Sequence, residues 1–204
     1  MKSTVICIGR QYGSGGREIG ERLAERLGIV CYDKLLIQQA AKDTGLSPGT
    51  VEEDEEKPIG LCETVSGNPF ADSAVLGMTF YSEKQRVFEA ERRAILEIAA
   101  KGPCVIIGRC ASSVLRGAGV DVLSVFVYAD PDDRAKRIAE RNRISVKEAL
   151  RKAEKVDRMR KKYFDFYSDT PWGDPASYDL MVSSSHYGID GTADVIARAI
   201  TEEM

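Results

Sequence analysis

The sequence has no long hydrophobic run, no CxxC pair and only one histidine, and each absence excludes a class of protein. The longest nearly apolar run, Val122 to Ala129, is interrupted by Ser124 and is far shorter than the roughly 18 residues of a membrane-spanning helix. The five cysteines are widely spaced, which indicates buried reduced thiols rather than a zinc site or a disulfide framework. A single histidine, His186, excludes catalysis by two histidines, and we expect it in a solvated loop. These absences favour a soluble, cytoplasmic protein with no membrane partner.

Charge is unevenly distributed along the 204 residues. The net charge is −3, but the segment 132–162 holds 13 lysines and arginines against 6 acidic residues. Nucleic-acid-binding proteins usually present a broad basic face, so an acidic chain with one basic segment favours a small phosphorylated ligand and no nucleic acid. An acidic run at 52–56 is expected to be a solvated helix face or the edge of a lid. With 43% hydrophobic and 30% charged residues, the composition is that of one globular domain.

Short apolar, β-branched segments alternate with amphipathic segments along the chain. The predicted strands are 4–8, 29–32, 104–107, 123–128 and 180–182. The predicted helices are 17–27, 34–43, one from 47, 82–101, one from 131, one from 146 and one from 190. Because the strands are apolar throughout and are separated by helices, both faces of the sheet must be covered. The sequence therefore predicts a three-layer α/β fold with a five-stranded parallel sheet.

A glycine-rich loop, Gly13–Gly16, lies between the first predicted strand and the first predicted helix. Glycines there let the backbone amides at a helix N-terminus approach an anion closely. The loop departs from the dinucleotide fingerprint G-x-G-x-x-G because Glu18 replaces the third glycine, although Asp33 ends the second strand, as that motif requires. It departs from the P-loop pattern because the first glycine is missing, and Gly16 and Arg17 replace the lysine and the Ser/Thr. Both alternatives, and a tight turn without a ligand, stay open on the loop alone.

Further motifs distinguish between them. They are G-R-Q-Y-G-S-G-G-R-E-I at 9–19, Y-D-K-L-L at 32–36, G-P-C-V-I-I-G-R at 102–109, D-R-A-K-R-I at 133–138, I-S at 144–145, W-G-D-P at 172–175 and Y-D-L at 178–180. In this combination, over nearly the whole chain, the sequence resembles the cytidylate-kinase-like proteins, relatives of the nucleoside monophosphate kinases.

The resemblance implies a P-loop kinase-like fold, with a core at 1–46, 82–150 and 176–204. It also implies a mobile monophosphate-binding insertion at about 47–81 and a basic lid at about 151–175. The implied activity is ATP-dependent phosphorylation of a nucleoside monophosphate, CMP or dCMP first. A nucleotide- or phosphate-binding protein without kinase turnover is the alternative, and a dinucleotide-dependent oxidoreductase is the third.

Position by position, the resemblance also implies site residues. Those for ATP are Gly13, Ser14, Gly15, Gly16, Arg134 and Ser184, those for the acceptor are Asp33, Arg109 and Arg137, and those for the transferred phosphoryl group are Arg158 and Arg160. Arginines suit this chemistry because their planar fork binds phosphate bidentately and stays charged. Arg17 is our first choice for the cation that replaces the missing lysine in ATP binding and catalysis, and Arg10 is the second. Mg²⁺ is expected with ATP, with Ser14, Asp33 and Asp130 as the candidate ligands.

Overall fold

The computed structural model describes residues 5–43 and 72–201, in which five parallel strands form one sheet in the order β2-β3-β1-β4-β5. The strands are β1 (Val5–Arg10), β2 (Val30–Tyr32), β3 (Cys104–Ile107), β4 (Val122–Tyr128) and β5 (Leu180–Ser183). In the centre of the sheet, Ile8 of β1 is in register with Ile107 of β3 and with Val125 of β4. Since all neighbours are parallel, the carboxyl ends of the strands meet at one edge.

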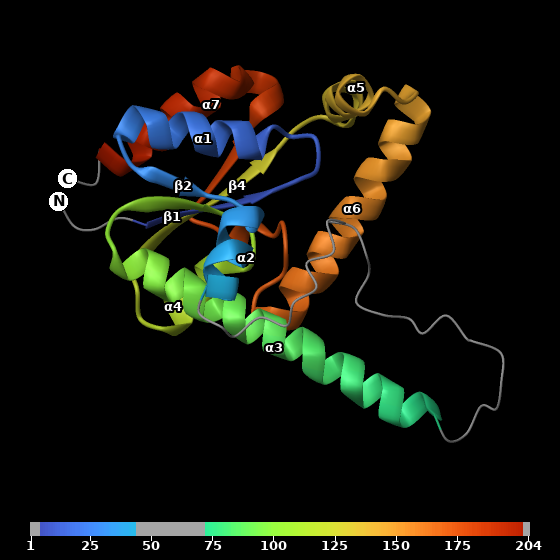
Figure 1. Ribbon diagram of the computed structural model, residues 1–204. Coiled ribbons are helices and arrows are strands. Elements are labelled where there is room, and N and C mark those ends of the chain that lie inside the picture. The colour runs from blue at the N-terminus through green and yellow to red at the C-terminus, as the bar shows by residue number, and fades with distance from the viewer. Residues whose placement is uncertain (1–4, 44–71, 202–204) are drawn as a thin grey trace.

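Helices cover both faces of this sheet (Figure 1). They are α1 (Gly16–Leu27), α2 (Lys34–Asp43), α3 (Asp72–Ala100), α4 (Ala111–Gly117), α5 (Pro131–Asn142), α6 (Val146–Tyr167) and α7 (Ser184–Thr201), with a short 3₁₀ turn at Pro175–Ser177. α1 and α7 lie on one face, α3 and α4 lie on the other, and α5 and α6 extend beyond the carboxyl edge. The predicted three-layer α/β fold with a five-stranded parallel sheet is therefore confirmed.

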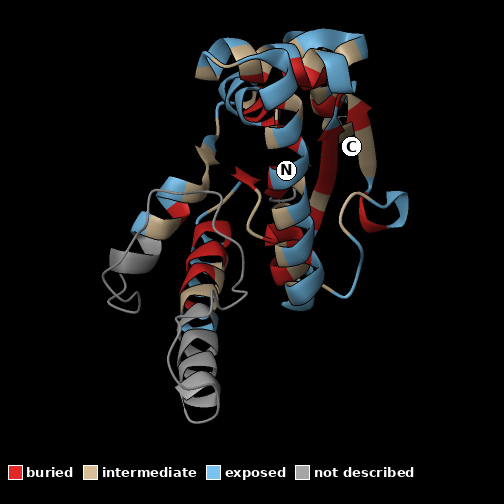
Figure 2. Cartoon of the chain, turned by 90° about the vertical axis from the view of Figure 1, so that its right-hand side faces the viewer, coloured by how far each residue is buried: buried red, intermediate tan, exposed pale blue. Residues whose placement is uncertain are grey.

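Successive side chains of β1 point to opposite faces of the sheet, and they contribute to two separate layers of the core. Val5 and Cys7 pack against α3 and α4, whereas Ile6 and Ile8 pack against α1 and α7. All four side chains are at most 3% exposed, and the three central strands, β1, β3 and β4, are buried along most of their length (Figure 2). Burial on both faces explains why these strands are apolar at nearly every position rather than at alternate ones.

Some elements differ from the prediction. α4 was not expected, α3 begins at Asp72 rather than at 82, and α7 begins at Ser184 rather than at 190. α7 is kinked at Gly188, whose φ of 69° is left-handed, so a short helical turn precedes the main helix. His186 lies exposed in that turn and not in a loop. The helix predicted from 47, the acidic run and most of the insertion at 47–81 lie outside the described residues.

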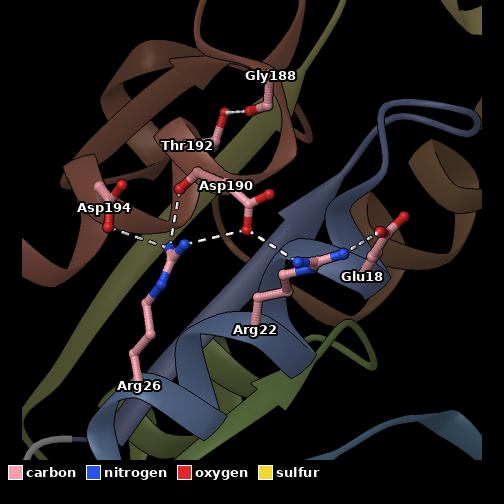
Figure 3. Close-up of polar contacts among 7 residues, drawn as sticks. All are labelled: Glu18, Arg22, Arg26, Gly188, Asp190, Thr192 and Asp194. Atoms are coloured by element: carbon pink, nitrogen blue, oxygen red, sulfur yellow. Dashed lines mark hydrogen bonds and ion pairs between the residues drawn. The ribbon is translucent and has the colours of Figure 1, made fainter.

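Ion pairs fasten the kinked segment of α7 to α1 (Figure 3). The Asp190 carboxylate contacts Arg22 and Arg26, each at 3.0 Å, and Arg26 also donates to the Asp190 carbonyl at 2.8 Å. The preceding residue, Ile189, packs so tightly onto Gly15 that a Cβ on Gly15 would lie 2.3 Å from the Ile189 Cδ1. The α1–α7 contact thus places a side chain against the glycine-rich loop.

The described helices include none that combines the length and the apolar character needed to cross a membrane.

Candidate functional site

The glycine-rich loop connects β1 to α1 at the carboxyl edge of the sheet. Gly13 and Gly15 have φ values of 82° and 78°, which only glycine adopts without strain. Gly15 is the N-cap of α1, and no side chain caps that helix end. The first amides of a helix have no carbonyl partner within it, and the helix dipole adds partial positive charge. The loop therefore presents backbone donors suited to a phosphate.

Side chains from the following helices hold the carbonyls of this loop. The Arg137 Nη1 donates to the Gly13 carbonyl at 3.2 Å, and the Ser184 Oγ donates to the Ser14 carbonyl at 2.6 Å. The Ser14 Oγ itself donates to the Gln11 carbonyl at 2.9 Å, and Ser14 is fully buried. Arg137, predicted to contact the acceptor, and Ser184, predicted to contact ATP, thus donate hydrogen bonds to carbonyls of the loop.

The Tyr12 peptide is clamped between α5 and α6. The Arg134 Nε donates to the Tyr12 carbonyl at 2.8 Å, and the Tyr12 amide donates to the Asp157 Oδ1 at 2.7 Å. Arg134 and Asp157 also form a largely buried ion pair. The guanidinium groups of Arg141 and Arg160 lie over the Tyr12 ring, 5.1 and 5.4 Å from its centre. Arg134, predicted to contact ATP, therefore holds the residue before the loop and pairs with Asp157 of α6.

The two arginines predicted to contact the transferred phosphoryl group differ in their surroundings. The Arg160 Nη1 donates to the Arg10 carbonyl at 3.1 Å, which places this side chain at the entrance of the loop. Arg158 lies exposed on α6, and within the described ranges no hydrogen bond or ion pair joins its side chain to another residue. The structure brings Arg160, and not Arg158, to the loop.

Arg17 and Asp33 lie together at the edge of the site. The Arg17 Nη2 is 2.8 Å from the Asp33 Oδ2, and the Arg17 Nε is 3.0 Å from the Glu21 Oε1. Asp33 also accepts from the Leu36 amide at 3.1 Å, which caps α2. The Arg17 side chain is 62% exposed. Its guanidinium is thus shared between two carboxylates.

The turn after β3 has an unusual backbone. Gly108, Arg109 and Cys110 have consecutive φ values of 77°, 56° and 53°. Left-handed conformations at the last two cost on the order of 1–3 kcal/mol each, and such strain is concentrated at functional sites. The Gly108 amide donates to the Ile8 carbonyl at 3.0 Å, so the turn lies directly beside the end of β1.

Arg109 belongs to a buried polar cluster with Glu91 of α3. The Glu91 Oε1 is 3.6 Å from the Arg109 Nε, and its carboxylate accepts from the Tyr163 hydroxyl at 3.0 Å and from the Gln38 Nε2 at 3.3 Å. Arg109 also lies over the Tyr163 ring, 5.3 Å from its centre. Burial alone would lower the pKa of Arg109, but the Glu91 carboxylate raises it, and the raising effects prevail. The acceptor arginine predicted from the sequence is thus held on a buried carboxylate.

Glu91 was not predicted, although the sequence contains a signal for it. It lies three residues after Phe88 and four before Ile95, on the helix face that those apolar residues define. A carboxylate on an apolar face is expensive to bury unless it is paired, so its position indicates a cationic partner.

Cys110 follows Arg109 and is 4% exposed. Burial raises the pKa of its thiol to about 12, which keeps it protonated and unreactive. This agrees with the expected buried, reduced thiols.

Arg10 crosses the site between the loop and the β3 turn. A Cβ on Gly16 would lie 2.6 Å from the Arg10 Cβ, and a Cβ on Gly108 would lie 2.0 Å from the Arg10 Nη1. The stem of Arg10 therefore packs on the start of α1, and its guanidinium lies over Gly108. Because neither Gly16 nor Gly108 has a Cβ, there is room for the Arg10 side chain at both positions.

A magnesium site of the usual P-loop type does not fit the described residues. That site uses a loop Ser/Thr hydroxyl and a carboxylate, but Arg17 stands at the hydroxyl position and the Ser14 hydroxyl points back to Gln11. Asp33 is paired with Arg17, and Asp130 is the N-cap residue of α5. In the described part of the chain, no group of three or more His, Cys, Asp or Glu residues could hold a metal ion.

The parallel sheet and the loop before α1 define a P-loop kinase fold. The model of the cytidylate kinase-like family matches residues 5–186, and the chain belongs to that family. The cytidylate kinase of Thermococcus kodakarensis is 31% identical over 96% of this chain and 87% of its own length. That of Methanococcus aeolicus is 30% identical over 98% of both chains.

Solved structures agree with this fold. A protein from Eubacterium ventriosum superposes with a TM-score of 0.73 and 28% identity, covering 97% of this chain and 98% of the other. The shikimate kinase of Bacteroides thetaiotaomicron superposes with a TM-score of 0.54 over 97% and 98% of the two chains. Its identity is 14%, so it shows the fold alone.

Proposed function

We propose that this protein transfers the terminal phosphoryl group of ATP to a nucleoside monophosphate, with CMP or dCMP as the preferred acceptor. The observation that carries the proposal is the position, after neighbouring strands, of two features suited to bind a phosphate. The loop before α1 follows β1, Arg109 follows β3, and these strands pair directly. Membership of the cytidylate kinase-like family supports the choice of acceptor.

Phosphoryl transfer requires in-line positioning and cations around the transferred group more than it requires an acid or a base. In this proposal, the amides at the start of α1 bind the phosphates of ATP, and Arg109 binds the phosphate of the acceptor. Arg160 approaches from α6, and Asp33 borders the acceptor nucleoside. Arg134, Arg137 and Ser184 keep the loop in shape by engaging its carbonyls.

Nucleotide binding without turnover is the second candidate. The observation that favours it is the loop itself, in which Gly16 and Arg17 stand where the catalytic lysine and the metal-binding hydroxyl are usually found. A dinucleotide-dependent oxidoreductase is not favoured, because Glu18 occupies the position of the third glycine and its carboxylate pairs with Arg22 at 3.2 Å.

The test is an assay of ADP formation by the purified protein with ATP, Mg²⁺ and a panel of monophosphates: CMP, dCMP, UMP, AMP and GMP. We expect the fastest turnover with CMP or dCMP. Arg109→Met should raise the KM for the monophosphate by about 10- to 150-fold, the loss expected for one charge-assisted hydrogen bond, and should leave the KM for ATP nearly unchanged.

Arg92→Met is the matched control, because Arg92 lies on α3 with its side chain 41% exposed. ATP binding without ADP formation for every acceptor would favour the second candidate. Absence of ATP binding would overturn both.

A further inference from the structure

The cation that the loop lacks must come from a residue other than the usual lysine. We propose that Arg10 is that residue and that its guanidinium contacts the phosphate chain where the donor and acceptor sites meet. This inference rests on the proposed function and adds a phosphate-binding residue to it.

The position of Arg10 follows from its place in the sheet. It is the last residue of β1, and β1 lies between β3 and β4. Its stem packs against Gly16 at the start of α1, where the phosphates of ATP are proposed to bind. Its guanidinium lies over Gly108, one residue before Arg109, where the acceptor phosphate is proposed to bind. The side chain thus spans the two sites between which the phosphoryl group must move.

Charge and geometry suit this role. A guanidinium presents several donors in a planar fork, so one arginine can contact oxygens of two phosphates at once. Cations placed there stabilise the charge that is spread over the transferred group in the transition state. An arginine between the sites can therefore act on the reaction, whereas one at the rim of the site affects mainly binding.

The backbone of Arg10 is held in place from both sides. Arg10 is in register with Val127 of β4, and its carbonyl accepts a hydrogen bond from the Arg160 Nη1 at 3.1 Å. The adjacent Gln11 amide donates to the Val127 carbonyl at 3.0 Å. A cation attached to a fixed strand end is already positioned, so little order is lost when a phosphate binds.

Arg17 is less suited, although it is closer in sequence to the position of the missing lysine. Its guanidinium contacts both Asp33 and Glu21, and its side chain is 62% exposed. Its guanidinium therefore lies at the rim of the site, whereas that of Arg10 lies over Gly108 between the loop and the β3 turn. The structure thus favours Arg10 over Arg17, the reverse of the order that the sequence suggests.

Equilibrium binding of ATP, measured by titration calorimetry, and the rate of CMP phosphorylation together test the proposal. Arg10→Met should weaken ATP binding by about 10-fold or more and reduce kcat by roughly 10³-fold. Arg10→Lys, which keeps the charge but loses the fork, should recover part of both losses. Arg92→Met, whose side chain is 41% exposed on α3, is the control and should stay within about 3-fold of the wild type in both measurements. Arg17→Met should lose less than Arg10→Met in both measurements.

The outcomes separate this proposal from the proposed function. Wild-type ATP affinity in a folded Arg10→Met protein, or in Arg10→Gln if the methionine variant does not fold, would overturn the role of Arg10. A wild type that binds ATP but phosphorylates no monophosphate would overturn the kinase activity, and the ATP affinities of the variants would still decide the phosphate contact. A wild type that does not bind ATP would overturn both.

Discussion

Glu91 is expected to be the side chain whose charge matters most to the stability of the site. Its carboxylate is 2% exposed and is the shared acceptor for Tyr163 and Gln38 and the counter-charge of Arg109. Glu91→Gln keeps the size of the side chain and one acceptor oxygen, but it removes the negative charge. The substitution therefore isolates the ion pair from the packing around it.

The magnitude follows from the burial of the two partners. Breaking a buried ion pair costs about 3–5 kcal/mol, because the remaining charge is left uncompensated in a poorly solvated place. The Arg109 side chain is 19% exposed, so solvent offsets part of that cost and the low end, about 3 kcal/mol, applies. For a chain of this length each kcal/mol lowers Tm by roughly 2–4 °C, which gives a decrease of roughly 6–12 °C.

Urea unfolding, followed by far-UV circular dichroism and by the fluorescence of the single tryptophan, Trp172, measures this loss. Glu89→Gln is the control, because Glu89 lies on the same helix with its side chain 49% exposed and 3.7 Å from Arg92. We expect the control to stay within about 0.5 kcal/mol of the wild type.

A double-mutant cycle gives the sharper result. Arg109→Gln alone leaves Glu91 buried without its counter-charge, whereas the double variant Glu91→Gln with Arg109→Gln leaves neither charge unpaired. The double variant should therefore be more stable than the sum of the two single losses predicts, by about 2 kcal/mol or more. Additive losses, or a Glu91→Gln protein as stable as the Glu89→Gln control, would refute the reasoning.

Two further predictions concern the loop and its support. Gly15→Ala should abolish ATP binding and destabilise the fold, because the added Cβ would lie 2.3 Å from the Ile189 Cδ1. Gly28 is the control, because it is also left-handed but a Cβ there would have no atom within 4 Å. Gly28→Ala should cost only about 1–2 kcal/mol of stability and keep the ATP affinity. Asp190→Ala should lower Tm slightly in dilute buffer and not in 1 M NaCl, because its ion pairs are exposed. Thr192→Val, which removes the buried bond from Thr192 to the Gly188 carbonyl, should cost about 1 kcal/mol at either salt concentration. Equal salt dependence in the last two variants would contradict this distinction.

The sheet could be predicted because burial on both faces leaves a simple pattern. The strand at Cys104–Ile107 was predicted with its actual bounds, since four consecutive apolar residues between Pro103 and Gly108 fit only a short buried strand. The seven-residue helix Ala111–Gly117 was not predicted. It is too short to show a clear helical period in the sequence. It also starts directly after Arg109 and Cys110, whose left-handed conformations are not predicted by their residue types.

The glycines of the loop could be predicted for a stronger reason. Gly13 and Gly15 do adopt left-handed conformations, which other residues tolerate poorly, so their presence marked the turn. The roles of Arg134 and Arg137 could not be predicted from the residue type alone, because they depend on what the side chains can reach in the fold. Both arginines lie on one face of α5, and a long side chain there can reach either a bound phosphate or the carbonyls of the loop. Only the fold shows that the carbonyls are in reach, and the nucleotide contacts of these residues stay a prediction.

The lid predicted at 151–175 also stays a prediction, but the structure limits how it could work. Its helix, α6, contacts the entrance of the loop through Asp157 and Arg160 and contacts Glu91, the partner of Arg109, through Tyr163. These residues follow one another in steps of three, so a single stretch of helix touches both the glycine-rich loop and the Glu91–Arg109 cluster. A rotation of α6 that released the Tyr12 amide from Asp157 would also shift the hydroxyl that Tyr163 donates to Glu91. Opening of such a lid would therefore loosen the glycine-rich loop and the contacts of Arg109 together rather than one at a time.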